Sequence, residues 1–200
     1  MADDSLLLSV LEFLRERGAL GESSLTAAVA HADSFVVAVP EDCRTLLDLG
    51  SGGGLPGLVI ASRLPQVHIV LTDRREHRTD LLRRACAQLG FDDRVSVRTG
   101  DVRDLGRLPA LRETADVVTA RAFGEPLWTL RCARPFLRPG GSVVVSEPPP
   151  APPSGNRSVA GQGDERWSAT AVARLGFIAA ASESSRVSRF VRVVSLSSST

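Results

Sequence analysis

The chain has 200 residues, enough for one globular domain with a short extension but not for the separate substrate domain that many dehydrogenases add. Its hydrophobic share of 43% can build a core, yet no run approaches the about eighteen apolar residues of a membrane span, and the N-terminus is acidic where a secretory signal is basic. The net charge is +1, and all 24 cationic side chains are arginine, so overall charge indicates no particular partner. We expect a cytoplasmic protein with no membrane contact.

The cysteines and histidines predict neither a disulfide framework nor a metal site. Three cysteines are widely spaced and odd in number, so reduced thiols are expected. The three histidines form no metal-ligand spacing with one another or with the cysteines.

Hydrophobic periodicity predicts two helices first, over 5–17 and 25–39, and we assign 1–40 to an N-terminal helical extension and 41–200 to the main domain. Strands and helices then alternate. The predicted strands are 45–49, 67–72, 94–98, 115–120 and 142–146. The predicted helices between them are 56–64, 75–89, 107–112 and 126–137.

The remaining chain begins with a segment rich in proline and glycine, residues 148–164, which we expect to be an exposed or mobile loop. A helix near 166–174 and strands at 177–182 and 187–197 follow. The alternation predicts an α/β fold: a Rossmann-like, doubly wound, seven-stranded, mostly parallel sheet that ends in an antiparallel hairpin.

The segment LLDLGSGGGLPG, residues 46–57, joins a buried strand to a helix through a glycine-rich turn. A ligand at this turn would rest on free N–H groups at the helix N-terminus. Because Gly52, Gly54 and Gly57 satisfy GxGxxG and Asp73 follows about twenty residues later, a dinucleotide-binding unit is one interpretation. A turn that merely joins strand to helix is another.

Asp48 favours a third interpretation, because it stands before the first glycine, where dinucleotide-binding strands are usually apolar. The run DLGSGGG resembles the first motif of class I methyltransferases, which implies S-adenosylmethionine as the cofactor. In that arrangement Asp73 would accept hydrogen bonds from the ribose hydroxyls, and Asp101 and Val102 would flank the adenine. Each aspartate alone could instead cap the helix that follows it.

A narrower resemblance covers roughly residues 24–146. The runs DLGSGGGLPG, LTDRREHRTDLLRRACAQLG, GDVRDL and TARAFGEPLWTL are similar to the bacterial 16S ribosomal RNA guanine-N7 methyltransferase family. Its most specific parts are Leu55-Pro56-Gly57 and Arg121-Ala122-Phe123. The resemblance implies ribosomal RNA or the small ribosomal subunit as partner. It also implies the cofactor-binding residues, which we predict to be Asp48, Gly50, Ser51, Gly52, Gly54, Leu55, Asp73, Asp101, Val102, Arg103 and Arg121.

Guanine N7 already carries a nucleophilic lone pair, so this chemistry needs alignment of donor and acceptor more than a general base, and we name no catalytic residue. Arg121 is a candidate for positioning, by pairing with the cofactor carboxylate or an RNA phosphate. A structural ion pair with Glu125 or Asp116 is its alternative role. Phe123 either stacks on a base or belongs to the core.

Arginines cluster after the second predicted strand, where they either contact phosphates or form a solvated helix face. These residues are Arg74, Arg75, Arg78, Arg83 and Arg84. The chain departs from the family at Ser146 and Glu147, where the family has a Lys-Gly pair. A carboxylate there would repel RNA phosphate. Two alternatives therefore stay open: a diverged paralogue that methylates a small molecule, and a non-catalytic module that binds cofactor or RNA.

Overall fold

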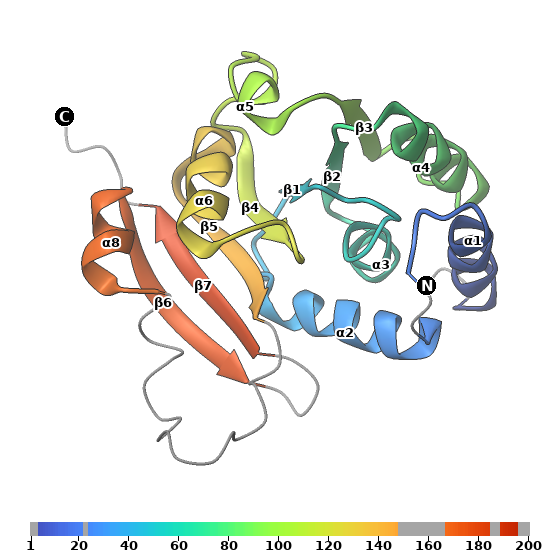
Figure 1. Ribbon diagram of the computed structural model, residues 1–200, viewed down its shortest axis with the longest axis horizontal. Helices are drawn as coiled ribbons and strands as arrows, with labels where there is room; N and C mark the ends of the chain where they lie inside the picture. The colour runs from blue at the N-terminus through green and yellow to red at the C-terminus, as the bar shows by residue number, and fades with distance from the viewer. Residues whose placement is uncertain (1–3, 22–23, 148–166, 185–188, 196–200) are drawn as a thin grey trace.

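The computed structural model describes residues 4–21, 24–147, 167–184 and 189–195. Its strands form one seven-stranded sheet in the order β3-β2-β1-β4-β5-β7-β6 (Figure 1). The strands are β1 Thr45–Leu49, β2 His68–Asp73, β3 Val95–Thr99, β4 Ala115–Ala120, β5 Leu137–Glu147, β6 Phe177–Ser184 and β7 Arg189–Ser195. The first five are parallel, and β7 runs antiparallel to both β5 and β6. The predicted fold class is confirmed.

Helices cover both faces of this sheet because alternate strand residues point to opposite sides. The helices are α1 Asp4–Glu16, α2 Leu25–Ala38, α3 Gly57–Arg63, α4 Glu76–Gln88, α5 Val102–Leu105, α6 Pro126–Ala133 and α8 Ala169–Arg174. Leu46 of β1 packs in one core with α1 to α4. Its neighbour Leu47 packs in a second core with α5, α6 and α8. Helix α1, from the predicted N-terminal extension, buries Leu7, Leu11 and Leu14 in the first core.

The order of the strands reverses between β1 and β4. From β1 the chain moves to β2 and β3 on one side, then returns to β4 and β5 on the other. At the carboxyl ends of the two central strands, Leu49 pairs with Ala120. A crevice at such a switch point is the usual ligand position in doubly wound sheets.

Two predicted elements after β3 were wrong in their bounds. The predicted helix at 107–112 is a series of turns, and α5 lies earlier, where the Asp101 carboxylate caps it by accepting a hydrogen bond from the Arg103 N–H at 2.9 Å. Helix α6 ends at Ala133, short of the predicted 137, and a 3-10 turn containing Pro135 follows, because proline cannot supply the next helical N–H.

Strand β5 begins at Leu137, five residues before the predicted start, and continues through Gly140 and Gly141. A register shift between Ala115 and Val117 of the neighbouring β4 accommodates this irregular stretch. The predicted loop 148–164 lies outside the described residues. None of the helices within the described ranges is long and apolar enough to cross a membrane.

Candidate active site

A cleft of about 420 Å³ opens at the carboxyl ends of the parallel strands. Five of the predicted cofactor-binding residues line it: Gly50, Asp73, Asp101, Val102 and Arg103. They follow β1, β2 and β3, which are far apart in sequence but adjacent in the sheet. The volume lies within the range of small-molecule and cofactor pockets.

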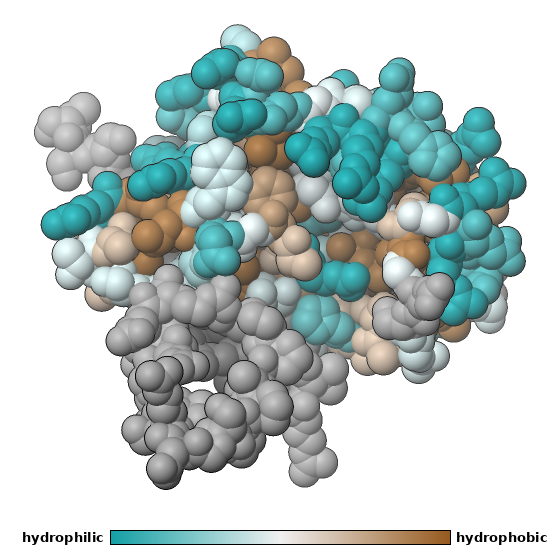
Figure 2. All heavy atoms as spheres, in the orientation of Figure 1, coloured by the Kyte–Doolittle hydropathy of each residue, from teal (hydrophilic) through white to brown (hydrophobic). Residues whose placement is uncertain are grey.

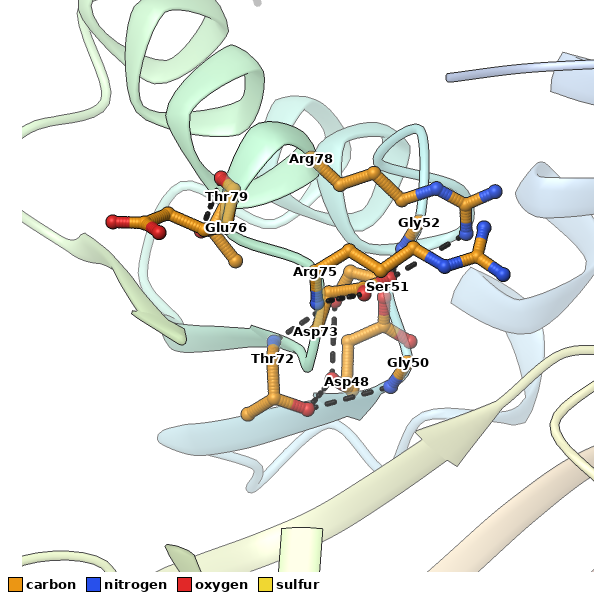
Figure 3. A network of polar contacts seen from close by, with 10 residues as sticks. All are labelled: Asp48, Gly50, Ser51, Gly52, Thr72, Asp73, Arg75, Glu76, Arg78 and Thr79. Atoms are coloured by element: carbon orange, nitrogen blue, oxygen red, sulfur yellow. Dashed lines mark hydrogen bonds and ion pairs between the residues drawn. The ribbon is translucent and has the colours of Figure 1, made fainter. Parts of the chain in front are cut away.

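The glycine turn after β1 is tied to the end of β2. The Ser51 N–H donates to the Thr72 carbonyl at 2.7 Å, and the Ser51 hydroxyl accepts a hydrogen bond from the Thr72 N–H at 3.1 Å. The Gly50 N–H reaches the Thr72 hydroxyl at 3.3 Å (Figure 3). Gly50, with a φ of +64°, therefore presents a well-held backbone surface to the cleft.

Other glycines of this run are required by packing against protein. A Cβ at Gly53 would lie 2.4 Å from the Leu20 side chain, and a Cβ at Gly57 would lie 2.3 Å from Leu71. Four of the predicted cofactor-binding residues in this run do not line the cleft: Ser51, Gly52, Gly54 and Leu55. They shape the turn on which the cleft is built.

Asp73 ends β2 and holds the turn and the start of α4 together. Its Oδ2 accepts a hydrogen bond from the Gly52 N–H at 3.1 Å, and its Oδ1 accepts one from the Arg75 N–H at 2.9 Å. The Arg78 guanidinium lies 3.6 Å from Oδ2 (Figure 3). The carboxylate thus lies at the cleft with its orientation set by three partners.

Asp101 and Arg103 form the wall of the cleft at the start of α5. The Arg103 guanidinium donates to both carboxylate oxygens of Asp101 at 2.8 Å. These hydrogen bonds hold the pKa of Asp101 well below its ordinary value and raise the pKa of Arg103. Arg103 also lies over the Trp128 ring, 6.0 Å from its centroid, so the wall extends to α6.

Asp48 and Arg121 lie outside the cleft lining, at the junction of β1 and β4. Asp48 is buried, and its Oδ1 accepts a 2.7 Å hydrogen bond from the Thr119 hydroxyl. Among the described residues, none makes a hydrogen bond with Oδ2 of Asp48. The backbone N–H of Gly57 nevertheless lies near enough to favour the charged form of the carboxyl. Burial raises the pKa of Asp48 to about 6, against the effect of the Thr119 hydrogen bond.

Arg121 is half-buried, and burial lowers the pKa of its guanidinium while the charge of Asp48 raises it. The structural ion pair with Asp116 is not formed, since Asp116 binds the Arg138 guanidinium at 2.8 Å. Within the described part of the chain, Glu125 also lies beyond ion-pair distance of Arg121. Burial is the larger cause that lowers the pKa of His31 in α2, and the charge of the Arg121 guanidinium lowers it further.

Ala122 and Phe123 follow β4 and line the cleft. Ala122 has a φ of +49°, a left-handed conformation that costs a residue with a Cβ about 1 kcal/mol. The Phe123 ring lies against the glycine turn, because a Cβ at Gly50 would be only 2.8 Å from its Cδ2. Backbone strain of this kind is common at functional sites.

Sequence reasoning missed three residues that line the cleft, namely Gly100, Ala122 and Trp128. Gly100 stands beside Asp101 in the GDVRDL run and could have been predicted from that motif. Ala122 was noted only as part of a triplet, and Trp128 carries no local signal, because its place at the cleft depends on how α6 packs. Arg74, Arg75 and Arg78, which were considered as phosphate contacts, also line it.

The strand order, the reversed last strand and a cleft between a glycine turn and strand-end aspartates define the class I methyltransferase fold. Solved structures share it: an O-methyltransferase from Bacillus cereus in complex with SAH has a TM-score of 0.68 at 20% identity, covering 96% of this chain and 91% of that one. A putative O-methyltransferase from Klebsiella pneumoniae has a TM-score of 0.67 at 18% identity, covering 98% and 91%.

The chain belongs to the rRNA small subunit methyltransferase G family, whose model matches residues 28–147. Its similarity to the ribosomal RNA small subunit methyltransferase G of Synechococcus sp. (strain CC9902) is 36% identity over 53% of this chain and 44% of that protein. The protein of the same name from Leuconostoc citreum (strain KM20) is 32% identical over 61% of this chain and 48% of that protein. The chain therefore matches less than half the length of these relatives. The family resemblance inferred from the motifs is confirmed.

Proposed function

We propose that the chain is an S-adenosylmethionine-dependent methyltransferase that acts in the cytoplasm on guanine N7 of 16S ribosomal RNA. The observation that carries the proposal is the meeting of Gly50, Asp73 and Asp101 at one cleft, on the switch point of a methyltransferase fold. Family membership supports the same activity.

The residues present suit this cofactor. The Gly50 backbone borders the cleft without a side chain, and a Cβ there would meet the Phe123 ring. Asp73 would hold the ribose hydroxyls, and Asp101 with Val102 would border the adenine.

Bound S-adenosylmethionine supplies a methyl group on a positively charged sulfonium. The chain's own residues then need only to hold the acceptor base in line and exclude water. Phe123 offers an apolar ring beside Gly50. Arg121 follows β4 outside the cleft lining, and it would act on an anionic group through its charge. Guanine N7 needs no proton removed before transfer, so the proposal requires no general base.

Calorimetry with S-adenosylmethionine and with NAD tests the cofactor. We expect S-adenosylmethionine to bind with a dissociation constant in the micromolar range, which corresponds to a binding free energy of about 8 kcal/mol. We expect no comparable binding of NAD. Replacement of Asp73 by Asn should weaken the binding of S-adenosylmethionine at least tenfold. Preference for NAD would contradict the proposal.

Transfer of labelled methyl groups to small ribosomal subunits tests the acceptor. Subunits from cells that lack the gene should accept about one methyl group each, recovered as N7-methylguanosine. Transfer to a small molecule instead would favour the paralogue that Glu147 suggested, and cofactor binding without any transfer would favour a non-catalytic module.

A further inference from the structure

The rim of the cleft carries an excess of positive charge. Four of its lining residues are arginines, Arg74, Arg75, Arg78 and Arg103, against two carboxylates, Asp73 and Asp101. Arg103 pairs with Asp101, and Arg78 lies 3.6 Å from Asp73. The whole chain has a net charge of only +1, so this concentration is local. In Figure 2 hydrophilic residues gather over α4 and α5.

Arg74 and Arg75 supply the excess. Both are exposed, and in the part of the chain that the structure describes neither guanidinium has a carboxylate within ion-pair distance. Arg75 and Arg78 are both directed from the start of α4 toward the glycine turn (Figure 3). Like charges converging on one cleft repel one another unless an anion lies between them, so the arrangement favours an anionic ligand.

Trp128 gives the same rim an aromatic face. This residue, near the start of α6, is 43% exposed, and it is one of only two tryptophans in a chain without tyrosine. The ring packs close to Gly124, where a Cβ would lie 3.0 Å from its Cδ1, and Arg103 lies over it. An exposed, well-held ring beside arginines is the combination that binds single strands, with stacked bases and neutralised phosphates.

We propose that this rim binds single-stranded RNA flanking the acceptor base, with Arg74 and Arg75 on its phosphates and Trp128 stacked on one of its bases. The inference rests on the proposed function and extends it, because it identifies where the RNA lies. Two unpaired arginines and an exposed ring fit a strand of several nucleotides, which offers more than one phosphate and a base to stack.

The test measures binding of a short, fluorescein-labelled single-stranded RNA containing guanine, by anisotropy over a range of salt concentrations. Each lost phosphate contact should lower the salt slope by about 0.7, so R74A/R75A should lower it by about 1.4. The matched control R83A/R84A removes the same charge from α4 outside the cleft, where Arg83 pairs with Asp80. We expect a slope close to that of the wild type.

Stacking is tested with W128A and the conservative W128F. We expect W128A to weaken RNA binding about tenfold and W128F less than threefold. In a Trp167→Phe background, RNA should quench the fluorescence of Trp128, the remaining tryptophan of the chain. Equal loss of RNA affinity in R83A/R84A and R74A/R75A would overturn the proposal, as would unchanged affinity and slope in R74A/R75A.

Calorimetry with S-adenosylmethionine shows whether Arg74 and Arg75 bind the carboxylate of the cofactor or the phosphates of RNA. If R74A/R75A loses cofactor affinity and keeps RNA affinity, the arginines serve the cofactor carboxylate and the proposal is wrong. If AMP competes as strongly as RNA, the rim holds a mononucleotide and the proposal is again wrong. Wild-type protein that binds RNA at this rim but methylates no small subunit would refute the proposed function alone.

Discussion

Asp48 should make the stability of the chain depend on pH in a way that Asp48→Asn removes. Burial raises the pKa of this carboxyl from an ordinary 3.8 to about 6 in the folded chain. A folded-state pKa above the unfolded one means that the folded chain holds the proton more tightly, so the contribution of Asp48 to wild-type stability falls as pH rises from about 4 to about 6 and then levels off. Two pKa units correspond to about 3 kcal/mol.

Asparagine keeps an oxygen for the Thr119 hydroxyl and removes the charge. In the variant Arg121 loses the negative charge that raises its pKa. This loss shifts the free energy of unfolding of the variant by an amount that does not depend on the titration of residue 48. We therefore expect the free energy of unfolding of Asp48→Asn, minus that of the wild type, to increase by about 2 to 3 kcal/mol between pH 4 and pH 7.

The assay is urea unfolding at half-unit pH steps, read by fluorescence. Thr119→Val is the companion variant, because it removes the hydrogen bond that favours the charged form. Its stability should fall more steeply than that of the wild type above pH 5. A difference between Asp48→Asn and the wild type that stays constant with pH would refute the reasoning, and one that declines with pH would show that Arg121 outweighs burial.

Three further variants or probes test the packing around the cleft. Gly57→Ala places a Cβ 2.3 Å from Leu71, so we expect a loss of about 1 to 3 kcal/mol in urea unfolding, and an unchanged midpoint would contradict the packing. Ala122→Gly relieves a left-handed φ of +49° and should gain about 1 kcal/mol, where a loss would show that Ala122 is unstrained. Burial raises the pKa of Cys43 and Cys86 to about 12, so Ellman's reagent should label them only on unfolding, and fast labelling of the folded chain would argue against burial.

The strands were predictable because their signal is local. Thr45–Leu49 and Ala115–Ala120 have the predicted bounds, since both are short apolar runs buried on two faces of a parallel sheet. The start of β5 was not predictable, because Gly140 and Gly141 indicate a turn locally. Pairing of Leu137 with Ala115, which no local pattern reveals, extends the strand.

The residues of the site likewise divide into those with a local sequence signal and those whose place depends on tertiary packing. Gly50, Asp73 and Asp101 belong to motifs and could be found from the sequence through its resemblance to class I methyltransferases. Trp128 could not, because its role depends on α6 lying beside α5. The glycine turn also had more than one cause: Gly53 and Gly57 are glycine because Leu20 and Leu71 pack against them, a tertiary requirement that resembles a ligand motif in sequence.

The most direct test of the central claim is the amount of N7-methylguanosine in small-subunit RNA, measured by mass spectrometry in cells with and without the gene. We expect the mark at one position to be lost without the gene and restored by the wild-type chain. Asp73→Asn should restore it only weakly, because Asp73 lies at the cleft and orients the glycine turn. An unchanged level of the mark in cells that lack the gene would contradict methylation of guanine N7 in 16S ribosomal RNA.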